Sequence, residues 1–138
     1  MQESQSSQET KMISKLKQIA KDIFKELGSG HSELIYQKAF EVALRLEKIA
    51  YESQRIVPIF YQKYNVGEGI ADIIINDPKG KILIELKAIS ADLSLKEEAQ
   101  VRKYAGGLVS IKEALLINFR QPNTKVVPNE PEIKEVKL

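Results

Sequence analysis

The strongest constraint on the fold is a pair of isoleucine-rich segments separated by a tight turn. Residues 70–76 and 81–89 are short and rich in β-branched side chains, which predicts two strands. Between them, Asp-Pro-Lys-Gly at 77–80 places proline early and glycine late, as a reverse turn favours. The pattern therefore predicts an antiparallel hairpin in which Ile74 lies opposite Leu83.

In this register two acidic residues, Asp72 and Glu85, face each other. Cross-strand partners project from the same face, with Cβ atoms about 4.5–5.5 Å apart. Two like charges among apolar neighbours destabilise a strand pair, so a compensating cation is needed. Lys87 lies two residues beyond Glu85 on the same face and offsets one charge, and a divalent ion on the carboxylate oxygens offsets the rest. Such an ion activates water and neutralises charge on a phosphate, which phosphodiester hydrolysis requires.

The alternative for this cluster is a lysine that bridges two acids on an exposed strand face. The register match, the apolar surroundings and the Glu-x-Lys spacing together favour the metal site over that alternative.

Apolar spacing predicts three helices, over residues 10–28, 32–50 and 94–109. A glycine closes the first helix, and Ser94 with Glu97 forms a capping box that opens the third. The second helix has an apolar stripe predicted to face the core, made of Leu34, Ile35, Ala39, Val42, Ala43, Leu46 and Ile49.

Two further strands are predicted, over residues 55–66 and 114–119. Pro58 cannot donate a hydrogen bond to a strand ladder, so the first of them is expected at a sheet edge. Together the elements predict an α/β fold, an α+β arrangement in which a mixed sheet is flanked by helices.

The chain has 138 residues, which fits one domain. We assign residues 11–120 to it, between a polar, disordered tail at 1–10 and an irregular, proline-containing tail at 121–138. The absence of cysteine excludes disulfides and thiolate zinc sites, and a lone histidine, His31, excludes mechanisms that need two. The formal charge of +2 is no strong footprint for nucleic acid. No apolar run could span a membrane and no secretion signal is evident, so an intracellular, cytoplasmic protein is expected.

Other residues are weaker candidates for the site. Glu33 lies in the first turn of the second helix, where the helix dipole alone favours an acid, so a metal role and a structural role both stay open. Tyr36 shares its helix face, and His31 precedes it in the loop, where a surface or capping role is more common. Gln100 and Tyr104 lie four residues apart on one face of the third helix, as a half-buried polar pair would also do.

Four motifs, in order along the chain, resemble those of the PD-(D/E)XK nuclease superfamily and of its GxxExxY branch: Gly30-x-x-Glu33-x-x-Tyr36, Asp72, Glu85-Leu86-Lys87 and Gln100-x-x-x-Tyr104. The last resembles the additional helix motif of RecB-like and Cas4-like nucleases. The segment 117–119 also resembles this branch. Two positions depart from the pattern: Ala71 replaces the proline before the aspartate, and Arg120 stands where the branch usually has glycine. Neither departure removes a ligand.

The resemblance implies a restriction-endonuclease-like core and a divalent metal site. Mg²⁺ or Mn²⁺ would be held by Asp72 and Glu85, with the backbone carbonyl of Leu86 as a further ligand and Glu33 binding directly or through water. Lys87 would be the catalytic lysine.

Around that centre the resemblance implies supporting and substrate-binding side chains. Gln100 and Tyr104 would steady the lysine or contact phosphate, which places them with the catalytic residues. His31 and Tyr36 are candidate contacts to substrate.

The first functional hypothesis is therefore a metal-dependent nuclease, with DNA expected over RNA as its substrate. A second is a catalytically silent nuclease-fold module that binds nucleic acid or a protein partner. A third is a structural or oligomerising domain with an incidental acid pair. A homodimer or a partner protein is compatible with each of these.

Overall fold

The structure is a computed structural model that describes residues 2–138, with side chains from residue 11 onward. The elements, in chain order, are α1 (Gln2–Leu27), α2 (Glu33–Leu46), β1 (Tyr51–Tyr61), β2 (Tyr64–Ile75), β3 (Lys81–Lys87), α3 (Leu95–Gly106), β4 (Ile111–Asn118) and β5 (Glu132–Val136). A disordered tail is predicted for residues 1–10. Residue 1 lies outside the described part, and side chains are not described for residues 2–10, so the tail stays a prediction.

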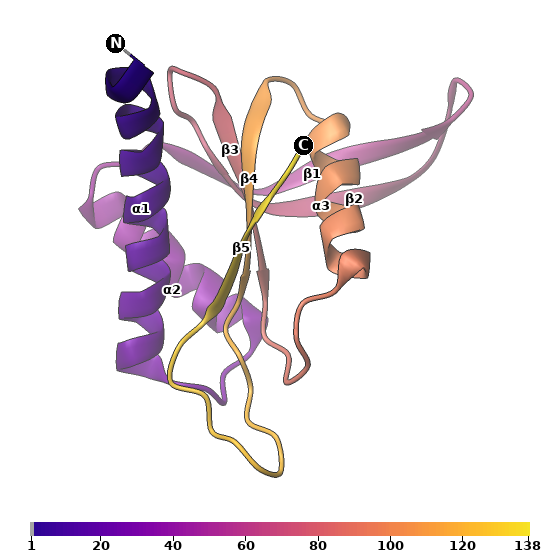
Figure 1. Ribbon diagram of the computed structural model, residues 1–138. Coiled ribbons are helices and arrows are strands. Elements are labelled where there is room, and N and C mark those ends of the chain that lie inside the picture. The colour runs from indigo at the N-terminus through magenta and orange to yellow at the C-terminus, as the bar shows by residue number, and fades with distance from the viewer. Residues whose placement is uncertain (1) are drawn as a thin grey trace.

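The strands form one sheet in the order β1-β2-β3-β4-β5 (Figure 1). All neighbours are antiparallel except β3 and β4, which run parallel and are joined by the crossover helix α3. The mixed sheet with flanking helices confirms the predicted α+β fold class. No helix among the described residues is long and apolar enough to cross a membrane.

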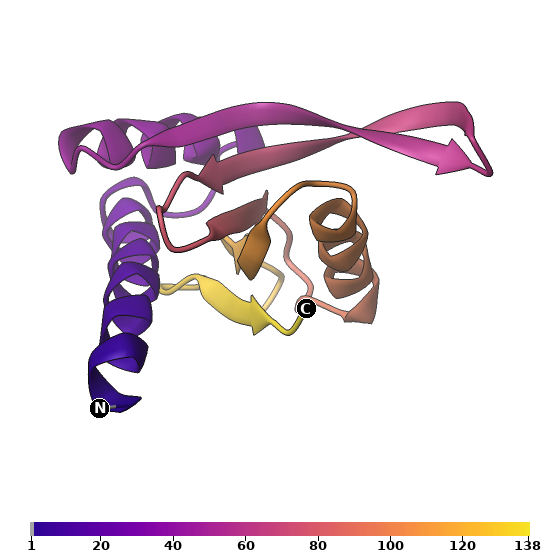
Figure 2. The same ribbon diagram turned by 90° about the horizontal axis from the view of Figure 1, so that it is seen from above.

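Helices cover both faces of the sheet (Figure 2). The core beneath α1 and α2 contains Ile73 and Ile84, and the core beneath α3 contains Ile74 and Leu83. Residues 73–75 of β2 and 82–86 of β3 are buried, with side chains in the cores on both faces, and these segments are nearly continuous apolar runs.

The hairpin of β2 and β3 has the predicted register, with Ile74 paired to Leu83. The Gly80 N–H donates to the Asp77 carbonyl (3.0 Å), and the Asp77 carboxylate accepts from the Lys79 N–H (3.0 Å). The turn chemistry read from residues 77–80 therefore sets the pairing of the two strands.

A second hairpin, formed by β1 and β2, differs from the single strand predicted over residues 55–66. The chain reverses at Gln62 and Lys63, where Tyr61 pairs with Tyr64. Gln62 takes a left-handed conformation (φ 57°) without glycine, asparagine or proline at the turn, so the sequence carries no signal for it. β1 lies at the sheet edge, as Pro58 predicted. The distal part, residues 56–70, projects past α3 and is called the arm below (Figures 1 and 2).

The buried side of α2 is not the predicted one. It contains Tyr36, Gln37, Phe40 and Leu44, whereas four of the residues predicted to face the core are exposed: Leu34, Ile35, Val42 and Leu46. The rings of Tyr36 and Phe40 enter the core, and the Tyr36 hydroxyl and the Gln37 amide find hydrogen-bond partners in the interior.

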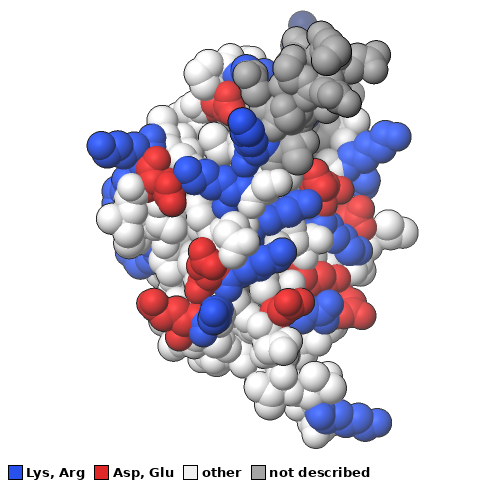
Figure 3. Space-filling view, turned by 60° about the vertical axis from the view of Figure 1, so that its left-hand side comes forward, with Lys and Arg blue, Asp and Glu red and all other residues white. Residues whose placement is uncertain are grey.

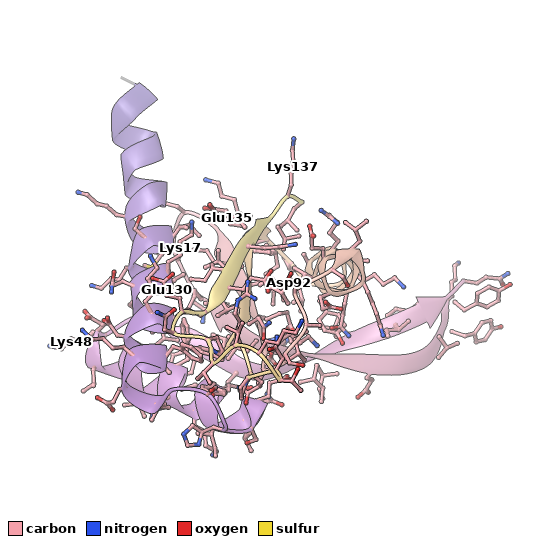
Figure 4. The ribbon with its side chains drawn as sticks, turned by 60° about the horizontal axis from the view of Figure 1, so that its bottom comes forward. Lys17, Lys48, Asp92, Glu130, Glu135 and Lys137 are labelled. Carbon is pink, nitrogen blue, oxygen red and sulfur yellow. The ribbon has the colours of Figure 1, made fainter. Side chains whose placement is uncertain are left out.

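The segment predicted to be irregular, residues 121–138, contains β5, which pairs with β4 through Ile117 and Ile133. Lys17 of α1 forms a salt bridge of 2.9 Å with Glu135, which ties the strand to the helix (Figure 4). This five-residue strand follows directly on a proline, and the prolines of the segment concealed it in the sequence.

The charge of the surface is mixed. On the face shown in Figure 3, basic and acidic side chains are interspersed and neither sign forms a continuous patch. This agrees with the formal charge of +2.

Candidate active site

The strands β2 and β3 separate where they carry Asp72 and Glu85. The ladder ends at the pair Ile73–Ile84, and side chains take over the hydrogen bonds beyond it. The Asp72 carboxylate accepts from the Leu86 N–H (2.8 Å), and the Glu85 carboxylate accepts from the Asp72 N–H (3.0 Å). The two acids thus converge between the strand ends, as the hairpin register predicted.

The opposite side of β2 is also irregular at Asp72. Gln54 of β1 lies between two paired positions and has a left-handed backbone (φ 53°). Its amide donates to the Gln37 carbonyl oxygen Oε1 (2.8 Å), and the Gln37 Nε2 donates to the backbone carbonyl of Asp72 (3.4 Å). This pair of amides holds the backbone that carries the acid. Sequence reasoning missed it, although Gln37 lies on the aromatic side of α2.

Burial raises the pKa of both carboxyl groups. Only 3% of Glu85 is exposed, and burial raises its pKa to about 8, with the negative charge of Asp72 acting in the same direction. Burial also raises the pKa of Asp72, against the lowering effects of the Leu86 N–H and of Lys87. Holding both groups ionised is therefore costly without a further positive charge. Two converging carboxylates are the donor set that hard divalent cations prefer, so the residues present fit such an ion.

Glu33, the first residue of α2, interacts electrostatically with this site. Burial raises its pKa, Lys87 lowers it and Asp72 raises it, so Glu33 is within electrostatic reach of both charges. Within the described part of the chain, no group of three or more His, Cys, Asp or Glu side chains is placed to hold a metal ion. The structure thus presents two converging carboxylates with Glu33 nearby, and does not bring the three acids into one cluster.

The loop before Glu33 is held in place by Tyr36. Tyr36 is fully buried, donates its hydroxyl to the Gly28 carbonyl (2.6 Å) and stacks on Phe119 (centroids 4.5 Å, interplanar angle 4°). His31 packs the edge of its ring against Tyr36 (5.8 Å) and is partly exposed. A substrate contact by Tyr36, which the sequence suggested, would require its hydroxyl to leave this buried position.

Gln121 completes the loop and was missed by sequence reasoning. Its Oε1 accepts from the Gly30 N–H (2.8 Å), and its Nε2 donates to the Tyr36 hydroxyl (3.3 Å). Gly30 has φ 105°, a conformation that favours glycine. The spacing from Gly30 to Tyr36 thus has a physical basis, because both ends of the segment that carries Glu33 are fixed.

Lys87 is positioned by α3 and by β4, the strand that follows α3. Its Nζ donates to the Gln100 Oε1 (3.4 Å). A groove of about 380 Å³ opens here, lined by Lys87, Ile89, Lys96, Glu97 and Gln100.

Asn118, fully buried, fixes the chain just beyond the lysine. It accepts from the Ile89 N–H (3.0 Å) and donates to the Ala91 carbonyl (3.3 Å). Lys87 is therefore carried by a backbone that is fixed twice: β3 pairs with β4 up to Lys87, and Asn118 holds the residues that follow.

Tyr104, four residues after Gln100, packs on β2 at Gly69. A Cβ atom at Gly69 would lie 2.8 Å from the Tyr104 Cζ and hydroxyl, so only glycine admits the ring here. Tyr104 thus fixes α3 against the strand that carries Asp72.

Gly69→Ala is therefore expected to lower the free energy of unfolding by about 1–2 kcal/mol, because the Tyr104 ring must move. Gly67→Ala is the matched control, since no atom lies within 4 Å of the added Cβ, and it should change stability by less than about 0.5 kcal/mol. Urea unfolding measures both variants. Equal effects would contradict the assignment of Tyr104 to this contact.

The comparisons with known proteins identify the family of this chain. A sequence model of the PD-(D/E)XK nuclease superfamily matches residues 10–129. Among curated proteins, none is a significant match to the sequence. The crystal structure of SSO0001 is similar, with a TM-score of 0.55 and 21% identity over 75% of this chain, which spans 49% of that chain; the likeness shows the fold alone. By the family match over most of its length, the chain belongs to the PD-(D/E)XK nuclease superfamily.

Proposed function

We propose that the protein is a metal-dependent nuclease that hydrolyses phosphodiester bonds in nucleic acid, with DNA as the expected substrate. The observation that carries the proposal is the convergence of the Asp72 and Glu85 carboxylates at separated strand ends. Membership of a nuclease superfamily supports it.

The ligands of the proposed Mg²⁺ or Mn²⁺ are Asp72, Glu85 and the backbone carbonyl of Leu86, with Glu33 acting through water. A bound ion of this kind lowers the pKa of a coordinated water and neutralises charge on a phosphate. Two carboxylates suffice, because Mg²⁺ usually keeps several waters and binds substrate phosphate oxygens as well.

Lys87 supplies a point charge beside the carboxylates. It is placed to orient the attacking water or to stabilise charge that develops on the phosphate. Gln100 is a positioning residue, because its side-chain oxygen accepts from the lysine and limits the directions the ammonium can take. Tyr104 acts further out by holding α3 on β2.

The test is cleavage of labelled single-stranded DNA, duplex DNA and RNA with Mg²⁺ or Mn²⁺. Asp72→Ala is expected to slow cleavage by about a thousandfold or more, because several kcal/mol of charge stabilisation are lost and each 1.36 kcal/mol is tenfold in rate. Asp92→Ala is the control, an exposed acid paired with Arg120, and should stay within about twofold of the original rate. Cleavage by Asp72→Ala at the original rate would mean that the activity comes from a contaminant.

A further inference from the structure

The exposed aromatic side chains of this protein are concentrated in one place. The chain has five tyrosines, four phenylalanines and no tryptophan, and six of these rings are buried or partly buried. The other three lie within five residues at the end of the arm: Phe60 (58% exposed), Tyr61 (67%) and Tyr64 (73%).

The remaining chemistry of the arm tip is basic or neutral. Gln62 and Lys63 form the turn between Tyr61 and Tyr64, and Asn65 follows. No acidic residue occurs between positions 56 and 67. Exposed rings beside a lysine and amide groups, without negative charge, are the features of surfaces on which nucleic-acid bases stack.

The arm is continuous with the candidate active site. β2 runs from Tyr64 at the tip to Asp72 at the acid pair, eight residues along one strand. At ~3.3 Å per residue this is about 26 Å. A stacked strand with ~3.4 Å per nucleotide covers that distance in about 8 nucleotides.

We propose that the arm tip, formed by Phe60, Tyr61 and Tyr64 around Lys63, binds unpaired bases of the nucleic acid about 8 nucleotides from the bond that the active site cuts. This inference rests on the proposed function and narrows its substrate to nucleic acid with a single-stranded segment. Each ring offers a face to an unstacked base, whereas bases inside a duplex have no free face. The low net charge fits this mode better than binding along a duplex backbone, which needs many basic contacts.

A second copy of the chain is the competing occupant of the arm. Aliphatic side chains on the arm are also about half exposed or more, namely Ile56, Ile59, Val66 and Ile70. They lie nearer the body than the aromatic tip, so the two occupants involve different residues and can be separated by substitution.

The first test measures binding of 5′-fluorescein-labelled oligo(dT) of 20 nucleotides by anisotropy, with EDTA present so that no cleavage occurs. The variant Phe60→Ala/Tyr61→Ala/Tyr64→Ala is expected to bind at least about 30-fold more weakly. Ile56→Ala/Ile70→Ala, a cross-strand pair on the same arm, is the matched control and should bind as the unchanged protein does. Circular dichroism checks that all the variants are folded, and analytical ultracentrifugation measures their mass in solution.

A spectroscopic readout separates stacking from a structural effect. Because the protein has no tryptophan, tyrosine emission can be followed directly. Bound oligo(dT) should quench it, and Tyr61→Phe/Tyr64→Phe should keep the affinity within about threefold while losing most of the quenching, because phenylalanine retains the ring.

Three results would overturn the proposal: unchanged affinity of the alanine variant, no binding of single-stranded DNA by the original protein, or a loss of affinity that only accompanies dissociation of a dimer. Cleavage with Mn²⁺ separates this failure from failure of the nuclease assignment. The alanine variant should cut a 20-mer poorly but a 5-mer, too short to reach the tip, at the original rate. Absence of any cleavage by the original protein would instead refute the proposed function.

Discussion

Replacing Lys87 by alanine is expected to lower the rate of nucleic-acid cleavage by about 10²–10⁴-fold and to leave divalent metal binding intact. The positive charge of the ammonium group acts on both carboxylates and opposes the burial that raises the pKa of Asp72 and of Glu85. Its removal takes away the charge proposed to assist the reaction, but the carboxylates proposed to hold the metal remain. The melting temperature should therefore still rise when Mg²⁺ or Mn²⁺ is added, because an ion that binds only the native state stabilises it.

Two substitutions complete this experiment. Lys87→Arg should not restore the rate, because a planar guanidinium cannot occupy the position of a compact ammonium. Lys96→Ala is the matched control, a second lysine lining the same groove, and should affect the apparent affinity for substrate more than the rate at saturation. Cleavage by Lys87→Ala at the original rate would refute the catalytic role. Loss of the metal-induced rise in melting temperature would show that the lysine acts on the fold or the metal instead.

The central geometry of the site could be predicted from the sequence because it depends on local chemistry. The turn at residues 77–80 fixes which residues of β2 and β3 are opposite. A slip of one position would place Asp72 opposite an apolar residue, Ile84 or Leu86, and would no longer bring it to Glu85. Asp72 and Glu85 could therefore be paired without knowledge of the rest of the fold.

The residues that support the site could not be predicted in the same way. Gln37 is hydrogen-bonded to Gln54, 17 positions away in the sequence. Gln121 is hydrogen-bonded to Gly30, 91 positions away. An uncharged amide has no local pattern that reveals a buried partner, and its role depends on how helices pack on the sheet. The buried side of α2 was misassigned for the same reason, because apolar spacing alone favoured the aliphatic residues over Tyr36 and Phe40.

The arm was not predicted because its turn lacks the glycine, asparagine or proline that usually signals a hairpin. Gln62 adopts a left-handed conformation that glycine or asparagine would normally supply. The strong β propensity of residues 55–66 suggested one continuous strand, although the chain reverses inside this segment.

The protein without metal is expected to lose stability as the pH rises from about 4.5 to about 8, because of Glu85. Its pKa is higher in the folded state than in an unfolded chain, so over this range the native state binds more protons than the unfolded state. The free energy of unfolding then falls with pH. The contribution is fully present below pH 4.5 and is lost as the pH passes the folded-state value of about 8.

Glu85→Gln should remove the part of this pH dependence that comes from Glu85, because the neutral amide occupies the same space without a charge; the part that comes from burial of Asp72 remains. At pH 8 and without metal the variant should be more stable than the original protein by on the order of 3 kcal/mol. Glu68→Gln, an exposed acid on the arm, is the control and should leave the pH profile unchanged. Urea unfolding with EDTA at pH 5, 6.5 and 8 measures all three proteins.

Addition of Mg²⁺ or Mn²⁺ at pH 8 should reverse the difference. The ion binds the ionised acid pair and so stabilises the original protein by RT ln(1 + [M]/Kd), whereas Glu85→Gln has lost a ligand and gains little. On the proposed function, the same buried carboxylates would destabilise the metal-free fold and stabilise the metal-bound one. If the original protein is equally stable at pH 5 and pH 8 without metal, and its melting temperature does not respond to either ion, the acid pair is not a metal site.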